Sequence, residues 1–289
     1  MNGCSYIGQG VRRASARFRL AVYLWLILMV LALLAAAPVN SLIRNQLGQL
    51  YFPVKPLQPF ELYLVDVFLT NQHFFSSFAG FLLSFLSLAV VLFVFLNAGL
   101  FGRMLTPDPV VTFREFLADG CRHFWRFLLS LLVFLPFLAI FFLLYRLLSA
   151  PLNLWSRQAV TEWPVIIASN LRMLLAILLW TAFKLFLDLA RIIIVHERKK
   201  VIHAYAAALR FLRRNFLKLW GLYLLLGLGV VLVSFLLLLS VSFSGSATPA
   251  GLFFSILLAQ LFIIFRLFAR QAFIGLEYIY FLENRGNQG

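Results

Sequence analysis

Charged residues are scarce in this sequence, and acidic residues are the scarcest. Only 12% of the 289 positions are charged, and Asp and Glu together number 10. An average soluble domain has about 25% charged residues, so this chain lacks the polar surface that a fold in water needs. Apolar residues make up 63% of the chain, and its mean hydropathy is +0.95. The composition excludes a soluble domain and a disordered chain, and indicates that lipid is the solvent.

Cysteine is also rare, because Cys4 and Cys121 are the only two and have no CxxC spacing. This excludes a disulfide framework and a thiolate metal site built from one chain. The four histidines have no joint metal spacing either: His73, His123, His196 and His203. The sequence has no GxxxxGK[ST] phosphate loop and no GxSxG nucleophile turn. We therefore expect no metal, no cofactor and no enzyme activity.

Six apolar segments are long enough to cross a bilayer, whose hydrocarbon core of about 30 Å needs roughly 20 helical residues. They lie near 20–38, 77–100, 127–147, 165–192, 219–242 and 251–273. Their continuous Leu and Phe runs lack the alternation of a membrane β-barrel, and only helices then pair the backbone groups in lipid. The sequence predicts an all-α, polytopic membrane protein with six transmembrane helices, forming one integral-membrane domain over residues 1–289.

The basic residues are distributed unevenly around these segments. Of the 25 Lys and Arg residues, 20 lie on the side that holds both termini, and 5 lie on the other side. The positive-inside rule therefore places both termini in the cytoplasm. The first segment follows four arginines like a signal peptide, but Pro38 directly after it is a poor cleavage position, so we interpret it as a retained span. The net charge of +15 beside apolar runs favours anionic head groups, and not nucleic acid, as partners.

Two connections on the basic side are predicted to be cytoplasmic amphipathic helices. Thr112 and Glu115 have the spacing of a capping box, so a helix is expected to begin there and continue to Arg126. The stretch 201–219 repeats the pattern with more charge, and its basic face is a candidate site for head groups: Arg210, Arg213, Arg214 and Lys218. The alternative is that both helices only anchor the spans that follow. Similar basic approaches to the first, third and fifth spans also suggest three helical-hairpin repeats.

Polar residues within the spans form the second candidate site. In the fourth span, Lys184, Asp188 and Arg191 share one helix face, and in the sixth, Arg266, Arg270 and Glu277 do the same. A bare charge at the bilayer centre costs roughly 3 kcal/mol or more, so we expect the two faces to meet in an inner-leaflet cluster, with Asn97 contributing. Such a cluster either pairs the helices structurally or binds a lipid phosphate.

Several blocks of the sequence resemble a known type of membrane protein. They are Phe113–Arg126, Asp188–Ile192, Ala208–Arg214 and Gly221–Tyr223. They resemble the recurrent blocks of uncharacterised bacterial six-span inner-membrane proteins, which are similar in layout to the membrane domain fused to some glycerophosphodiester phosphodiesterases. The resemblance implies a bacterial inner-membrane location and no established activity. The phosphodiesterase chemistry does not carry over, because this chain lacks the soluble catalytic domain.

These observations predict a non-enzymatic inner-membrane protein that binds or organises lipid, or scaffolds a partner, through a basic cytoplasmic face. The expected partners are membrane phospholipids with anionic head groups, and either another membrane protein or a second copy of the chain. The alternative is a transporter of a small anion or lipid that uses the charged cluster. An enzyme acting on lipid head groups ranks third.

Overall fold

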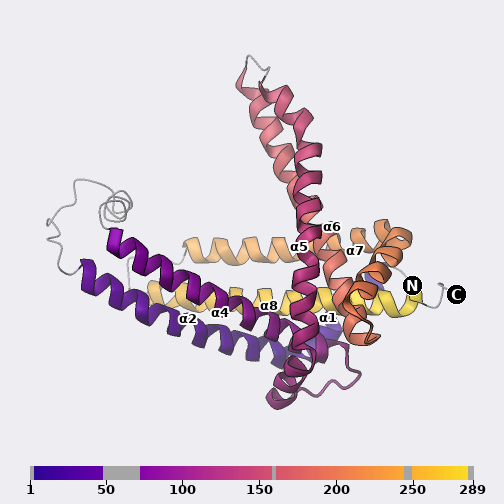
Figure 1. Cartoon of the computed structure of the whole chain (residues 1–289), viewed down its shortest axis with the longest axis horizontal. Coiled ribbons are helices and arrows are strands. Elements are labelled where there is room, and N and C mark those ends of the chain that lie inside the picture. The colour runs from indigo at the N-terminus through magenta and orange to yellow at the C-terminus, as the bar shows by residue number, and fades with distance from the viewer. Residues whose placement is uncertain (1–2, 48–71, 158–160, 244–248, 286–289) are drawn as a thin grey trace. The chain divides into compact units, whose positions relative to one another are not determined.

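The computed structural model describes residues 3–47, 72–157, 161–243 and 249–285. Within these ranges the chain forms seven helices and no strand (Figure 1), which confirms the all-α prediction. The helices are α1 (Gly3–Ala16), α2 (Phe18–Leu47), α4 (Gln72–Leu105), α5 (Phe113–Arg157), α6 (Glu162–His196), α7 (Val201–Phe243) and α8 (Pro249–Arg285).

Six of these helices are long and apolar enough to cross a membrane, as predicted. The segments concerned are Phe18–Pro38, Ala79–Leu105, Phe113–Arg157, Glu162–His196, Val201–Ser240 and Ala250–Arg285. The segments 112–126 and 201–219 were expected as separate amphipathic helices, but they form the start of α5 and of α7. That expectation was wrong because no proline stands between either segment and the apolar run after it, so nothing there breaks the helix.

The chain divides into two compact units. Unit 1 comprises Met1–Val22 with Phe95–Gly289, and unit 2 comprises Tyr23–Val94. Unit 2 contains most of α2 and α4, whose surfaces are apolar and exposed, as at Leu33 and Leu83. Unit 1 contains α1, the last turns of α4, and α5 to α8. The single membrane domain expected from the sequence stays a prediction.

Neighbouring helices of unit 1 pack in sequence order, α5 with α6, α6 with α7, and α7 with α8 (Figure 1). The N-terminal helix α1 packs along the C-terminal half of α8. Tyr6 meets Tyr280 with ring centroids 5.3 Å apart, and Phe18, just after α1, meets Phe268 at 6.1 Å. The order of these contacts shows that the two helices are antiparallel.

Helices α1 and α8 approach each other closely at two glycines. A Cβ atom added to Gly275 would lie 2.8 Å from the carbonyl oxygen of Gly10, and one added to Gly10 would lie 2.8 Å from the amide nitrogen of Leu276. These separations are shorter than van der Waals contact, so both positions need glycine. Gly227 and Gly229 on α7 have more space: a Cβ atom added to Gly227 would lie 3.8 Å from the Phe273 ring, and one added to Gly229 would have nothing within 4 Å.

Buried side chains of unit 1 gather at one end of its helices, where α5 and α7 begin and α4, α6 and α8 end. We call this the basic end. Fully buried residues there include Phe101, Phe116, Leu189, Phe211 and Ile274. Away from the basic end, the same helices expose large apolar residues, such as Leu143, Leu228 and Phe253. Apolar surface of this extent suits contact with lipid. Because the buried residues gather at the other end, the tertiary packing of unit 1 is concentrated at the basic end.

The corner between α4 and α5 is held by the predicted capping box. The Glu115 backbone N–H donates to Thr112 Oγ1 at 3.4 Å, and the Thr112 N–H donates to Glu115 Oε2 at 3.2 Å. The capping box is thus confirmed, and α5 begins at Phe113. Arg103 of α4 adds ion pairs to Asp119 at 2.7 Å and to Glu115 at 3.3 Å. Together these contacts fix the start of α5 against the end of α4.

Two arginines from the N-terminal segment bind the end of α4. Arg13 donates to the carbonyl oxygens of Met104 and Thr106, both at 2.9 Å. Arg17 donates to those of Thr106 and Asp108 at 2.6 and 3.0 Å. The last carbonyls of a helix have no partner within it, and cations are favoured near them. Burial lowers the pKa of Arg17 to about 10, so Arg17 stays cationic at neutral pH.

Candidate functional site

The centre of the charged cluster is Asp188 on α6, whose side chain is only 1% exposed. Arg270 of α8 binds both carboxylate oxygens: Nη2 donates to Oδ1 at 2.7 Å, and Nη1 donates to Oδ2. Arg191, one turn along α6, donates from Nη1 to Oδ1 at 3.4 Å. The structure therefore brings the charged faces of α6 and α8 together around one shared carboxylate.

Two phenylalanines border the cluster. The Arg270 Cζ lies 5.6 Å from the ring centroid of Phe101, and the Arg191 Cζ lies 6.0 Å from Phe101 and 5.9 Å from Phe127. The two rings are 5.7 Å apart and both are buried. Cations within about 6 Å of an aromatic ring are attracted to its face. Phe101 and Phe127 therefore stabilise the arginines and exclude water from the ion pairs.

Lys184 and Glu277 lie beside this network. Lys184 Nζ is 5.8 Å from the ring of Phe273, one turn before Glu277 on α8. Glu277 has no exposed surface, and neither carboxyl oxygen has a hydrogen-bond partner among the described residues. It interacts electrostatically with Asp188, Arg270, Lys184 and Arg191. Glu277 is thus a buried acid near four charges, with no hydrogen bond to its carboxyl oxygens among the described residues.

The two remaining members of the predicted cluster are Arg266 and Asn97. Arg266 is exposed and lies 5.8 Å from the ring of Phe262 on its own helix. Among the described residues Arg266 forms no ion pair with Asp188 or Glu277. It lies one turn before Arg270, in a part of α8 that is more exposed. Asn97 is buried on α4, one turn before Phe101.

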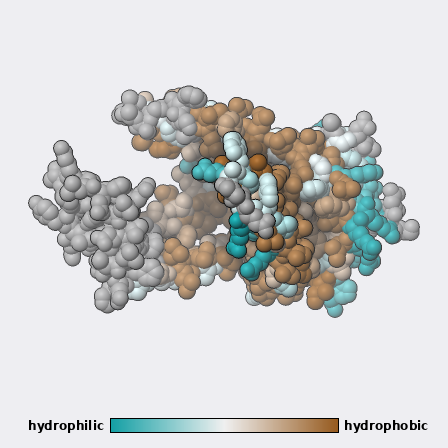
Figure 2. All heavy atoms as spheres, turned by 90° about the horizontal axis from the view of Figure 1, so that it is seen from above, coloured by the Kyte–Doolittle hydropathy of each residue, from teal (hydrophilic) through white to brown (hydrophobic). Residues whose placement is uncertain are grey.

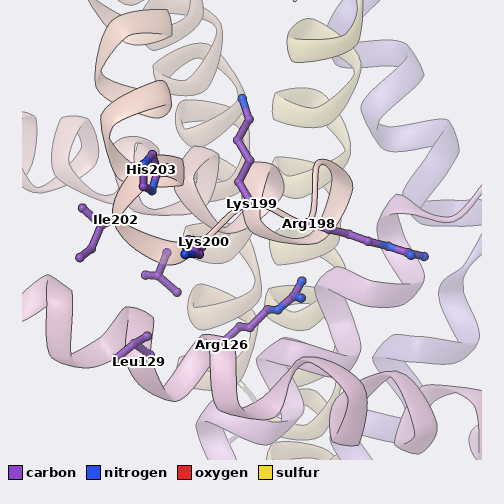
Figure 3. Close-up of a pocket in the computed structure, with 8 residues that line it drawn as sticks. Arg126, Leu129, Arg198, Lys199, Lys200, Ile202 and His203 are labelled. Atoms are coloured by element: carbon purple, nitrogen blue, oxygen red, sulfur yellow. The ribbon is translucent and has the colours of Figure 1, made fainter.

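A pocket of about 400 Å³ lies where α6 connects to α7 (Figure 3). We call it the basic pocket, and its lining consists of Arg126, Leu129, Arg198, Lys199, Lys200, Val201, Ile202 and His203. Arg126 and Leu129 come from α5, the next three from the connection, and the last three from the first turn of α7. The pocket thus combines cations with an apolar wall and has no acidic residue in its lining.

The charges of the pocket differ in their partners. Glu197 binds Lys199 at 2.6 Å and Arg285 at 3.0 Å, which fixes the connection at its start. Arg198 follows with φ 52°, a left-handed conformation that is uncommon outside glycine. Figure 3 shows Arg126 extending toward the connection, while Lys199 and Arg198 extend away from Arg126. Within the described residues, neither Arg126 nor Lys200 has a carboxylate within ion-pair distance.

The predicted head-group residues Arg210, Arg213, Arg214 and Lys218 are all exposed along α7. Buried residues such as Ala208, Phe211 and Leu219 lie on the other side of that helix. Figure 2 shows hydrophilic side chains gathered at the right-hand end of the view and near its centre, among largely hydrophobic ones. The sequence did not identify the basic pocket. The signal was present in the Arg-Lys-Lys run at 198–200, but Arg126 joins it from another helix.

A second pocket of about 200 Å³ shares Arg198 with the first and is lined by His123 and His196, among others. His123 is buried, and its Nδ1 has no hydrogen-bond partner in the described part of the chain. The Nδ1 of His196 is 3.4 Å from the Tyr278 hydroxyl. No group of three or more metal-binding side chains occurs within the described residues.

No protein-family model, no curated protein and no solved structure matches the chain. The resemblance to six-span inner-membrane proteins therefore stays a prediction.

Proposed function

We propose that this multi-pass membrane protein binds anionic phospholipid head groups through the basic pocket and the exposed cations of α7. It lies in the inner membrane of a bacterial cell with its basic end in the cytoplasm, and it organises lipid or holds a partner without catalysing a reaction. One observation carries the proposal, namely a pocket that joins uncompensated cations to an apolar wall at the end of membrane-length helices.

The surface of α5 supports this placement. Trp125 is 74% exposed and is followed by the exposed Arg126, after which the exposed large residues are apolar, from Leu129 to Leu144. Trp and Arg are typical of the membrane–water interface. The next cation on α5, Arg146, is twenty residues beyond Arg126, or about 30 Å along a helix, which matches a hydrocarbon core. Arg126 then lies at head-group level, and the basic pocket lies beside it.

The contacts of α6 agree with this placement of α5 in the membrane. Arg172 Nε donates to the Ala168 carbonyl at 3.3 Å, and Arg172 Nη1 donates to Asn153 Oδ1 near the end of α5. Arg172 is therefore level with the end of the α5–α6 hairpin that is distant from the basic end. At the other end, Arg191 contacts Phe127. The Asp188 network therefore lies at the level of Arg126, and away from the middle of the span.

The proposal is tested by the lipid that the purified full-length protein retains. We expect the double variant Arg126→Gln, Lys200→Gln to lose at least about half of its bound anionic phospholipid in native mass spectrometry, because charge-assisted hydrogen bonds to phosphate are lost. The control is Arg146→Gln, Arg157→Gln, which removes the same charge at the other end of α5. Equal lipid retention in both variants would refute the proposal.

Transport of a small anion or lipid through the charged cluster is the alternative. It needs cations that can bind the substrate, whereas Arg191 and Arg270 bind Asp188. The basic pocket has cations without such partners, so we place head-group binding first.

A further inference from the structure

The charges of the basic pocket point to a particular class of head group. We propose that the pocket recognises a phosphate monoester, as in a phosphatidate lipid, in preference to a phosphodiester such as phosphatidylglycerol. This inference rests on the proposed function and specifies the ligand of the same site.

The charges that line the pocket are not balanced. Lys199 is paired with Glu197, at 2.6 Å, and Glu197 also pairs with Arg285. Arg126, Arg198 and Lys200 have no carboxylate partner among the described residues, so the lining has three cations without a paired acid. A phosphate monoester carries about −1.5 to −2 charge at neutral pH, because its second pKa is about 6. A phosphodiester carries a single negative charge. A monoester therefore offsets up to twice as much of this positive charge as a phosphodiester does.

The N-terminus of α7 also forms part of the pocket. The pocket includes the first three residues of α7, which has no acidic residue in its first turn. The first amides of a helix have no partner within it, and its N-terminus favours an anion. The helix N-terminus adds to the field of the unpaired cations, and a third phosphate oxygen, which a monoester offers and a diester esterifies, can accept from its free N–H groups.

The apolar wall of the pocket indicates that the phosphate belongs to a lipid. Leu129 and Ile202 form an apolar wall, and Ile202 is 70% exposed. Leu129 belongs to the apolar surface of α5 that begins directly after Arg126. A phosphate bound at Arg126 and Lys200 would therefore place its glycerol and first acyl carbons along Leu129. A soluble phosphate ester leaves this wall exposed to water.

The test compares two short-chain lipids, dioctanoyl phosphatidate and dioctanoyl phosphatidylglycerol, on the delipidated full-length protein. Native mass spectrometry is run at about pH 7.5 and about pH 5. We expect about tenfold tighter binding of phosphatidate at the higher pH, the effect of roughly one additional charge-assisted hydrogen bond. The preference should disappear at the lower pH, where the monoester also carries one charge. It should also disappear in Arg126→Gln, Lys200→Gln and persist in Arg146→Gln, Arg157→Gln.

The outcomes separate this inference from the proposed function. Equal binding of the two anionic lipids at both pH values, above a phosphatidylcholine reference, would overturn the monoester inference and leave head-group binding in place. Binding of neither above that reference would overturn both. Displacement of phosphatidate by millimolar glycerol 3-phosphate would overturn the assignment to a lipid. The variant Lys200→Arg, which keeps the charge, should retain the preference, whereas loss in that variant would show that the effect is not electrostatic.

Discussion

Asp188 pairs with two guanidinium groups through one buried carboxylate. Removing charges from water is costly, and the attraction between them offsets that cost only when hydrogen bonds complete the pair. Arg270 meets this condition with two bonds to the carboxylate, and Phe101 and Phe127 limit access of water to the arginines. The stability of the pair therefore depends on all its members, and loss of the carboxylate is the most damaging single change.

The first prediction concerns this residue. Asp188→Asn should destabilise the protein by about 3 kcal/mol, because it removes the carboxylate to which two part-buried arginines are paired. In the double variant Asp188→Leu, Arg270→Leu, apolar residues replace both partners, and the loss should be much smaller than the sum of the two single losses. Thermal unfolding of the detergent-solubilised protein measures both effects. Additive losses would show that the two residues do not act as a pair.

The sequence predicted that Asp188, Arg191 and Arg270 are neighbours, since spacing along a helix determines which residues share a face. It did not predict the phenylalanines beside them. It also gave no sign that Arg17 binds the end of α4, 89 positions away at Thr106. A contact between distant segments has no periodic signature.

Among the elements, α5 and α7 combine two functions in one helix. Each begins in the packed basic end and continues as an apolar, exposed segment. The sequence predicted both halves, but it separated them because the change from charged to apolar residues resembles a boundary. A helix ends where its backbone hydrogen bonding is interrupted, and a change in polarity alone does not interrupt it.

The second prediction concerns the packing of α1 on α8. Gly275→Ala should lower stability by about 1–2 kcal/mol, because the new methyl group would overlap the Gly10 carbonyl and overpacking outweighs the gain in helix propensity. Gly229→Ala is the matched control in a helix. With nothing within 4 Å of the added carbon, it should be neutral or stabilising by up to about 1 kcal/mol. A rise in melting temperature for both variants would contradict the close approach.

The proposal that concerns the whole molecule is its orientation in the membrane. The 20 to 5 division of basic residues predicts a cytoplasmic basic end. In the structure, many of the cations on that side lie beside the packed core and the basic pocket. The lipid proposal and the orientation are therefore linked, since both place the same surface at the inner head groups.

The third prediction tests that orientation. Cys121 is exposed on α5, so in a Cys4→Ser background it should react with a membrane-impermeant maleimide in inverted vesicles and not in spheroplasts. A cysteine introduced at Ser246, in the connection before α8, should show the opposite pattern in a Cys4→Ser, Cys121→Ser background. Labelling of Cys121 from outside would reverse the proposed topology.

The sequence by itself determined that this protein is helical and has six membrane-length spans. Those properties follow from local composition and from the length of each apolar run, which a linear chain displays directly. The tertiary structure decided which charges are compensated and which are not. Asp188 and Arg270 stand 82 positions apart, and Arg126 meets the 198–200 run only because α5 packs beside the α6–α7 connection. Such pairings depend on helix register and on close contacts such as Gly10 with Gly275, and no single segment encodes them.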